Sequence, residues 1–310
     1  MLRDRDAAGL LPTGEAVSRL SCVAEVGVLA HETLQRTAEG RIAAAFDRSF
    51  YAELGTHWIC VGSSSIGSGP LHVLCEGWSS GAFAVGQRVT VTANVVHVDD
   101  APLASLAGAP VWTPEPPPAW TQAQLLAGLR VADRVWDAMP ADEGLAALGQ
   151  TKTPESSPPL LAAAIPGVRA LERIAGRAEH SPAPADRAAL AELIGLGPGL
   201  TPSGDDVLIG ALLALASLGR DDTRDALWAA CRSALDRTCD ISRAHLQAAA
   251  RGYGAAVLHD AIHAIVSGNT EKVEPALAAV SAVGHTSGRD GMAGALVALR
   301  AVSHALKFEK

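Results

Sequence analysis

The chain is poor in aromatic residues, which make up only 4% of its 310 positions. Apolar residues nevertheless reach 48% and charged residues only 19%, which argues against global disorder and provides for a large core. That core must be packed mostly by Ala, Leu, Val and Ile, which favours closely apposed helices with small residues at their contacts. The usual domain size of about 100–200 residues predicts two domains.

Clustered positive charge is also missing. The net charge is −8 and no basic run occurs, so a nucleic acid or an anionic membrane is not expected as a partner. No apolar run reaches the roughly 18 residues needed to span a bilayer, and the charged start Met1-Leu-Arg-Asp-Arg-Asp does not suggest a signal peptide. The five cysteines are odd in number and contain no C-x-x-C pair, so no disulfide framework is expected. These absences predict a soluble, reduced, cytoplasmic protein.

The first third of the chain has the pattern of a β-rich domain, which we expect over residues 1–109. Short apolar or alternating runs at 20–30, 57–61, 71–75 and 88–98 are separated by Gly- and Ser-rich turns. Residues 110–118 then carry five prolines, which exclude regular helix and a central strand. We therefore place a proline-rich linker at residues 110–120.

After the linker the hydrophobic period changes to that of helices. We expect a helical domain over residues 121–310 with about eight helices, among them 121–139, 160–178, 185–194, 204–218, 223–237, 241–267 and 288–306. Residues 150–159 are rich in Pro and Ser and are expected to be a loop. The predicted fold class is α+β, with a small β-rich N-terminal domain followed by a larger all-α domain.

One phrase occurs twice in the helical part, at residues 201–215 (TPSGDDVLIGALLAL) and 285–299 (HTSGRDGMAGALVAL). Aligned without gaps, the copies share eight positions, which include Ser203 with Ser287 and Asp206 with Asp290. Each copy is typical of a polar turn that opens an apolar helix. If the two helix starts meet in space, they frame one polar pocket.

Helix capping explains part of the repeat. Ser203 and Ser287 are good N-caps, and an aspartate three residues later completes a capping-box-like pair in both copies. Capping does not explain the Gly- and Pro-rich segment 195–202, which suits close approach of backbone N–H groups to a ligand. It also does not explain Gly210 and Gly294, because glycine inside a helix costs about 1 kcal/mol relative to alanine. A glycine at the same offset twice predicts that the two helix backbones touch there.

Carboxylates near these helix starts would repel the anion that the starts attract. One solution is a Mg²⁺ ion between the carboxylates and an anionic ligand, because Mg²⁺ prefers hard oxygen donors. The other is that the aspartates accept hydrogen bonds from N–H groups of the ligand while backbone amides hold its oxygens. A small anionic ligand with an amide or ureido end and a carboxylate end fits this second case. The pattern lacks the Gly-Lys-Ser/Thr of a P-loop.

The longer phrase Gly195-Leu-Gly-Pro-Gly-Leu-Thr-Pro-Ser-Gly-Asp-Asp206, followed by Gly210, resembles the AllH subunit family of oxamate carbamoyltransferase. Two further segments support the resemblance, Asp240-Ile-Ser-Arg243 and Gly284-His-Thr-Ser-Gly-Arg-Asp290. The resemblance covers about residues 195–299.

Membership in this family implies a role in purine and allantoin breakdown. The enzyme system moves the carbamoyl group of oxalurate to phosphate, giving oxamate and carbamoyl phosphate, and it needs several different subunits. The chain is thus expected to work with other carbamoyltransferase subunits. Two other interpretations stay open: a non-catalytic assembly subunit whose paired loops dock a partner, and a stand-alone protein that binds a small anion.

The expected catalytic residues are Asp206 and Asp290, which would hold the ureido N–H groups or a metal. Ser203, Ser287 and nearby amides would hold oxygens, and Arg243 or Arg289 would offset the charge of phosphate. The full set of expected substrate-binding residues is Gly197, Gly199, Thr201, Ser203, Gly204, Asp205, Ser242, Arg243, His285, Thr286, Ser287, Gly288 and Arg289.

Overall fold

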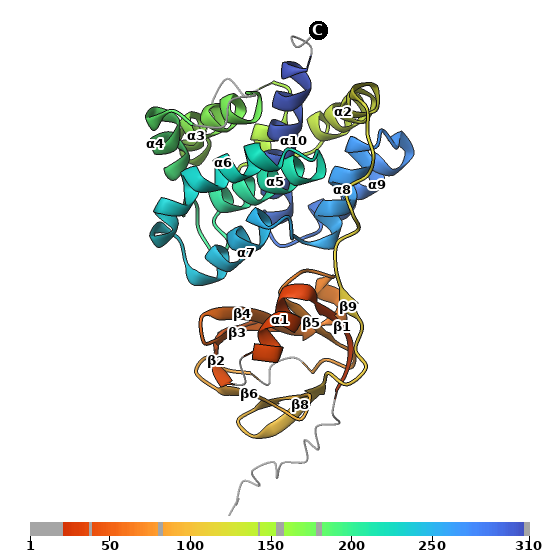
Figure 1. Cartoon of the computed structure of the whole chain (residues 1–310), viewed down its shortest axis with the longest axis vertical. Helices are drawn as coiled ribbons and strands as arrows, with labels where there is room; N and C mark the ends of the chain where they lie inside the picture. The colour runs from red at the N-terminus through yellow and green to blue at the C-terminus, as the bar shows by residue number, and fades with distance from the viewer. Residues whose placement is uncertain are drawn as a thin grey trace, which may run out of the picture.

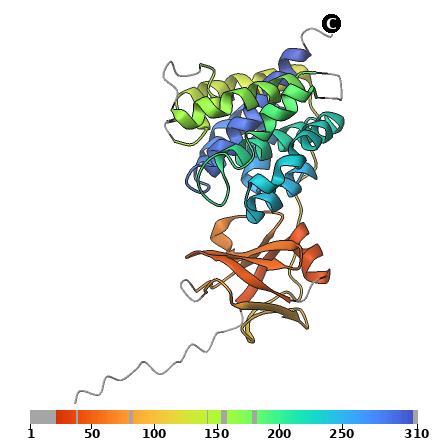
Figure 2. The ribbon, with the colours of Figure 1, turned by 90° about the vertical axis from the view of Figure 1, so that its left-hand side faces the viewer.

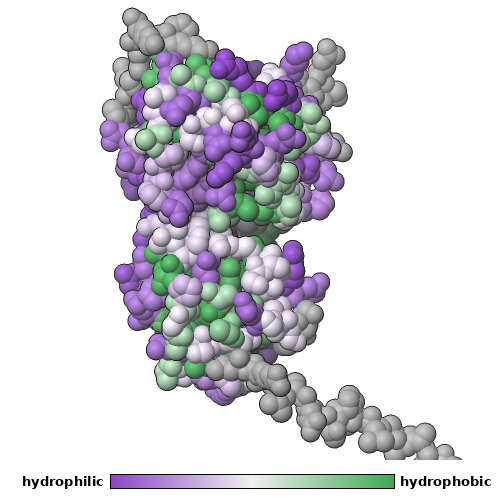
Figure 3. Space-filling model, turned by 90° about the vertical axis from the view of Figure 1, so that its right-hand side faces the viewer, coloured by the Kyte–Doolittle hydropathy of each residue, from purple (hydrophilic) through white to green (hydrophobic). Residues whose placement is uncertain are grey.

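The structure is a computed structural model that describes residues 21–36, 39–79, 83–141, 143–152, 158–177 and 182–306. The charged start of the chain, on which part of the expected location rests, lies outside these residues. The described chain has an N-terminal β region and a C-terminal helical region, so the α+β class is confirmed. The two regions are stacked end to end (Figure 2). The surface narrows between them in the space-filling view (Figure 3).

The β region is a single sheet whose two edges are joined. Its elements are β1 (Ser21–Gly27), α1 (Val28–Arg36), β2 (Glu39–Ala45), β3 (Ser49–Leu54), β4 (His57–Ser63), β5 (His72–Cys75), β6 (Arg88–Thr92), β7 (Val95–Val98), β8 (Ala101–Ser105) and β9 (Val111–Trp112). The strand order is β5-β4-β3-β2-β6-β7-β8-β1-β9, and β1 also pairs with β5. This second pairing leaves strand edges covered and encloses one apolar core.

Two sequence expectations for this region differ from the structure. The apolar run 20–30 is not strand throughout, because α1 begins at Val28 directly after β1. The alternating run 88–98 is two strands, since Ala93 and Asn94 adopt positive φ (51° and 61°) and form the turn between β6 and β7. The proline-rich stretch contributes only the short β9, whose Val111 pairs with Val26 beside the end of the sheet.

The helical region contains α2 (Gln122–Asp137), α3 (Pro159–Ala175), α4 (Pro184–Ala191), α5 (Ser203–Ser217), α6 (Asp221–Cys231), α7 (Asp240–Ala250), α8 (Ala256–Val266), α9 (Thr270–Ser281) and α10 (Ser287–Ala305). The single helix expected at 241–267 is wrong: the chain breaks after α7, where Gly252 has a φ of 82°. The end of the helix expected at 223–237 is a 3-10 turn, η3 (Arg232–Arg237), and α9 was not expected at all.

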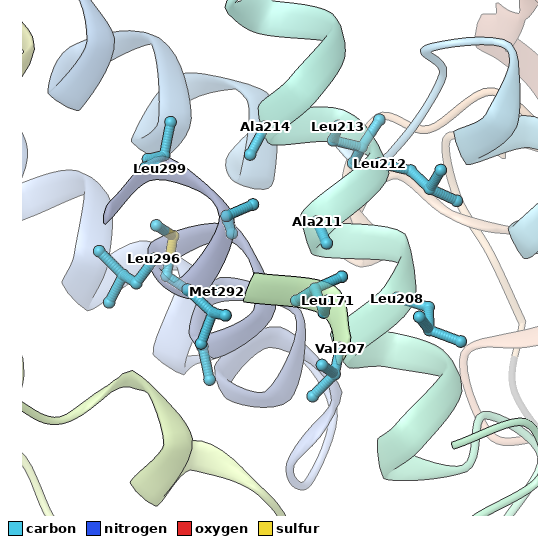
Figure 4. Packing of buried hydrophobic residues seen from close by; sticks show 14 of the residues in the cluster. Leu171, Val207, Leu208, Ala211, Leu212, Leu213, Ala214, Met292, Leu296 and Leu299 are labelled. Atoms are coloured by element: carbon cyan, nitrogen blue, oxygen red, sulfur yellow. The ribbon is translucent and has the colours of Figure 1, made fainter. Parts of the chain in front are cut away.

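Helix α5 runs through the middle of this region (Figure 1). Of its 15 residues, 13 are buried, as expected for a helix that is surrounded on all sides. Its main neighbour is α10. Small side chains line the side of α5 that faces α10, including Ala211 and Ala214, whereas Leu208 and Leu212 point away from it (Figure 4). The predicted core of small aliphatic residues between apposed helices is therefore what the structure has.

The β region meets the helical region mainly at α7. Leu29 and Leu71 pack against Ala244 and Ala248 of α7. Across the same boundary, the N–H of Ala256 donates to the carbonyl of Ser68 at 2.9 Å. Within the part of the chain that the structure describes, no helix has the length and apolar character needed to cross a membrane.

Candidate functional site

The two repeated helix starts lie side by side. A Cβ added to Gly210 of α5 would stand 1.7 Å from the carbonyl oxygen of Gly291, and one added to Gly294 of α10 would stand 1.9 Å from that of Val207. Only glycine permits this backbone contact. It brings the hydroxyl oxygens of Thr201 and Ser287, from the two copies, within 2.8 Å of each other. The expectation that the helix starts meet is confirmed.

The repeat also fixes each helix start against the preceding turn of chain. A Cβ on Gly204 would stand 2.1 Å from the carbonyl oxygen of Leu193, and one on Gly288 would stand 2.0 Å from that of Val280. The two glycines occupy the same position in the two copies. Their role is therefore close backbone packing beneath the site, and both are buried.

The capping interpretation of the two serines is wrong. Ser203 and Ser287 are the first residues of their helices, the N-caps are Pro202 and Thr286, and neither cap makes a side-chain cap hydrogen bond. Because the other helix start is so close, the serine hydroxyls have partners across the pair that compete with local capping. Thr201 to Ser287 is one such contact.

Two buried carboxyl groups lie beneath these hydroxyls. Asp206 is 6% exposed and Asp290 is fully buried. Burial raises the pKa of Asp206 well above its ordinary value; a hydrogen bond from Ser287 opposes the rise, and the nearby charge of Asp290 adds to it. Burial likewise raises the pKa of Asp290, opposed first by a hydrogen bond from Ser203. The influence is reciprocal: each serine lowers the pKa of the aspartate in the other copy.

Each of these carboxyl groups keeps one oxygen without a hydrogen-bond partner. Oδ1 of Asp290 accepts from the N–H of Leu145 at 2.6 Å. In contrast, Oδ2 of Asp206 and Oδ2 of Asp290 are buried and meet no donor among the described residues. Buried polar atoms without partners are rare because each carries a desolvation cost. The two unpartnered oxygens lie at equivalent positions of the repeat.

Asp205 has a different environment from its neighbour Asp206. Its carboxylate accepts hydrogen bonds from the N–H of Gly195 at 2.9 Å, from the hydroxyl of Ser242 at 2.6 Å and from the hydroxyl of Thr238. Asp205 and Ser242 are both fully buried. The two residues, which we expect to bind substrate, connect the glycine-rich segment with the start of α7.

The two arginines expected to offset phosphate charge are engaged by protein acceptors. The guanidinium of Arg243 donates to the carbonyls of Leu235 and Thr238 and pairs with Asp240 at 2.8 Å. Arg289 donates to the carbonyl of Pro140 at 3.1 Å and to Glu143 at 3.4 Å.

Arg289 also lies close enough to Asp290 to lower its pKa. Arg289 is therefore the one of the two arginines that the structure brings to the carboxyl pair.

The outer rim of the site is formed by the turns before α5 and α10. Gly197 and Gly199 have φ values of 114° and 95°, which other residues rarely adopt. Leu200 is 40% exposed beside them. On the other turn, His285 is exposed, with its Nδ1 3.7 Å from Oε2 of Glu143. The half-buried hydroxyl of Thr201 lies below this rim, and the two carboxyl groups lie deeper still.

One neighbour of the site comes from the β region and was not expected from the sequence. The hydroxyl of Tyr51 on β3 lies 3.0 Å from Nε2 of His245 on α7. Burial raises the pKa of Tyr51, with a further contribution from Cys60 and smaller ones that include the charge of Asp206. Burial lowers the pKa of His245 to about 4, so the ring is neutral. No motif surrounds Tyr51, so only the fold could reveal this contact.

The structure limits which metal could bind. Across the described residues, no group of three or more His, Cys, Asp or Glu side chains is arranged to hold a metal ion. Mg²⁺ commonly takes only one or two protein carboxylates together with phosphate oxygens. Asp206 and Asp290 are the carboxylates that the paired helix starts offer for such binding.

Comparison with known protein families identifies a match. The family model described as oxamate carbamoyltransferase subunit AllH matches residues 193–299. That span contains both copies of the repeat and the start of α7, and thus all the residues of the paired helix starts. No solved structure matches the chain. The resemblance predicted from the sequence is thereby confirmed: over residues 193–299 the chain is similar to oxamate carbamoyltransferase subunit AllH.

Proposed function

We propose that the chain is a subunit of a carbamoyltransferase that acts on oxalurate, or on a related ureido or amide acid, together with phosphate. The observation that carries the proposal is the pair of buried carboxyl groups, Asp206 and Asp290, each with one oxygen lacking a partner among the described residues. A ureido group offers N–H donors in the same small space. The likeness to the AllH family supplies the reaction class.

The substrate has two ends, and the paired helix starts offer groups that suit both. The ureido N–H groups would donate to Asp206 and Asp290. The N–H groups of Gly204 and Gly288 already donate to the carbonyls of Leu196 and Val283 at 2.8 and 3.2 Å. The N–H groups of Ser203 and Ser287, at the first positions of α5 and α10, would therefore be the ones that hold substrate oxygens. The hydroxyls of Thr201, Ser203 and Ser287 would set the orientation of the bound group.

The raised pKa of Asp206 suggests how its carboxyl group would take part in the reaction. An oxygen of phosphate forms a bond to the carbamoyl carbon, and the bond from this carbon to the amide nitrogen of oxamate breaks. The electron pair stays on that nitrogen, which then takes up a proton. A carboxyl group whose pKa is raised by burial keeps its proton to higher pH and can donate it there. The proton of hydrogen phosphate would restore the carboxyl group.

We further propose that a partner subunit completes the phosphate site. Arg243 and Arg289 already serve protein acceptors, so the charge of phosphate calls for another cation. Because Leu200 and His285 are exposed on the rim, a partner could reach the site there. A Mg²⁺ ion held by the two aspartates would be a second way to supply positive charge.

The wider setting follows the same proposal. The enzyme would act in purine and allantoin catabolism, in the cytoplasm. The chain would consist of two domains, residues 1–109 and 121–310, joined by the linker 110–120. The β domain would support the site through the Tyr51–His245 contact.

One observation favours a second candidate function. Leu200 is a large apolar side chain exposed at the tip of the glycine-rich turn. A non-catalytic assembly subunit would use this turn to dock a partner, without any chemistry at Asp206. Two substitutions distinguish these functions. Leu200→Ser would prevent assembly in both cases, but only the catalytic function requires the carboxyl group of Asp206.

The test is the phosphate-dependent formation of carbamoyl phosphate from oxalurate by the assembled complex. Loss of a proton-transfer group typically costs 10²–10⁴-fold, so Asp206→Asn should lower kcat by about 100-fold or more. Asp290→Asn removes an acceptor for the ureido N–H groups and should lower the activity as well. Asp236→Asn, a change at an exposed position after α6, is the matched control and should have no effect. Unchanged activity of Asp206→Asn in an intact complex would refute the catalytic role and leave the assembly function.

A further inference from the structure

A second polar site lies at the other end of α10. Helices α2, α3 and the last part of α10 line an open cavity of about 1030 Å³. None of the residues of the paired helix starts lines it. We propose that this cavity binds a phosphorylated organic molecule of about the size of a nucleotide. The proposal goes beyond the transferase function and does not depend on it.

The lining is rich in arginine although the chain as a whole carries a net charge of −8. Its charged side chains are the two acids Asp133 and Glu172 and five arginines, namely Arg130, Arg169, Arg173, Arg177 and Arg300. Asp186 lies behind the lining and forms ion pairs with Arg173 and Arg177, so the five arginines exceed the three acids by two positive charges. An excess of positive charge in a concave site attracts anions. Arginine in particular binds phosphate through paired N–H donors in a fixed planar arrangement.

Some of these arginines are held in place by the protein. Arg300 donates to Oδ1 of Asp133 at 3.0 and 2.7 Å and to the carbonyl of Gly149 at 2.6 Å. Arg173 donates to Oδ1 of Asp186 at 2.9 and 2.6 Å. These contacts use only part of each guanidinium, which has five N–H donors. The remaining donors are therefore positioned in advance for a ligand.

Two other arginines have no acceptor. Arg130 on α2 and Arg169 on α3 are exposed and make no ion pair or hydrogen bond within the described residues. They stand on the two helices that flank the cavity. Each can therefore turn to a bound phosphate without breaking an existing contact.

A buried hydroxyl group provides independent evidence for a ligand. Ser303 lines the cavity, is only 1% exposed, and its Oγ meets no hydrogen-bond partner among the residues that the structure describes. A buried hydroxyl without a partner carries a desolvation cost of about 1–3 kcal/mol. A polar ligand atom in the cavity would remove that cost.

The size and apolar part of the lining indicate more than a free phosphate ion. Leu129, Val168 and Val297 are buried residues that contribute apolar surface to the cavity beside the arginines. Sites for small organic ligands usually measure about 300–1,000 Å³, so this cavity stands at the upper end of that range. An inorganic phosphate would leave most of it empty. A phosphate attached to a ring or sugar would use both the charged and the apolar lining.

The test is isothermal titration of the full-length chain with AMP and, separately, with pyrophosphate. We expect AMP to bind with one-to-one stoichiometry. It should bind more tightly than pyrophosphate, because only AMP has a nucleoside that can contact the apolar lining. Charge-assisted hydrogen bonds contribute about 1.5–3 kcal/mol. Arg130→Ala and Arg169→Ala should therefore each raise the Kd for AMP about tenfold or more.

Two further variants complete the experiment. Arg232→Ala changes an exposed arginine outside the cavity and should leave the Kd unchanged. Ser303→Ala removes only the unpartnered hydroxyl; it should weaken AMP binding without lowering the Tm. The proposal is overturned if neither probe binds at millimolar concentration, if pyrophosphate binds as well as AMP, or if AMP binds Arg130→Ala and Arg169→Ala as it binds the wild type.

Discussion

A single methyl group at Gly210 would test the pairing of the two helix starts. The Cβ of alanine there would stand 1.7 Å from the carbonyl oxygen of Gly291, and Cβ contacts below 3.0 Å are essentially never found. The helices α5 and α10 would thus have to separate by about 1.3 Å or more at this point. The same displacement at the helix starts would break the 2.8 Å contact between Thr201 and Ser287.

The expected change in stability is the balance of two opposite effects. Alanine is favoured over glycine in a helix by about 1 kcal/mol. Overpacking in a core costs about 1–3 kcal/mol or occasionally more. The obstructing atom is a backbone carbonyl oxygen, which cannot rotate away. The overpacking cost is therefore expected near the upper end of this range. We expect Gly210→Ala to lower the free energy of unfolding by about 2 kcal/mol.

Urea unfolding, followed by circular dichroism, measures this difference. The matched control is Gly291→Ala, in the facing helix, because a Cβ there meets Leu258 at 3.4 Å and the carbonyl oxygen of Asp206 at 3.6 Å, which are ordinary contacts. That control should be neutral or stabilising by up to about 1 kcal/mol. If Gly210→Ala unfolds at the same urea concentration as Gly291→Ala, the close backbone contact between the two helices is refuted.

Three further substitutions test single contacts. Asp206→Asn should raise the Tm by an amount that grows as the pH rises above about 4. Burial raises the folded-state pKa of Asp206 above its ordinary value of 3.8, so the native wild type binds an extra proton and loses stability as the pH rises, whereas Asn does not titrate. A Tm difference that stays constant with pH would contradict this. Asp205→Asn should instead destabilise by about 1–3 kcal/mol in urea unfolding, because its carboxylate accepts three hydrogen bonds from buried protein donors, and an unchanged midpoint would be inconsistent with that role. Tyr51→Phe should lower the free energy of unfolding by about 1 kcal/mol in the same assay, because it loses the hydrogen bond to His245. The control Tyr253→Phe should lower it little. Equal effects of the two substitutions would count against the contact.

The pairing of the helix starts could be predicted from two glycines of the repeated phrase. Gly210 and Gly294 occupy the same offset in two copies of one phrase, and their cost within a helix calls for a tertiary reason. The reciprocal contacts of the serines were not predictable. Local propensity favours Ser203 and Ser287 as N-caps, but the helix start across the pair offers competing partners that only the fold brings close.

Other parts of the fold depend on contacts that the sequence pattern does not record. The break between α7 and α8 rests on the positive φ of Gly252, in a stretch whose apolar period continues on both sides. Tyr51 and His245 lie 194 positions apart in the chain, in two regions whose hydrophobic residues repeat with different periods. The charge of Arg243 can be read from the sequence, but its hydrogen-bond acceptors cannot. In the structure its guanidinium donates to two backbone carbonyls.

In the proposed function, Asp206 and Asp290 act together on one bound molecule. The most direct measurement is a double-mutant cycle on the rate at which the assembled complex forms carbamoyl phosphate from oxalurate and phosphate, with Asp206→Asn, Asp290→Asn and the double variant. Groups that act as a unit are strongly non-additive, so the double variant should be about as slow as the slower single variant. Effects that multiply would show two independent residues and contradict the account.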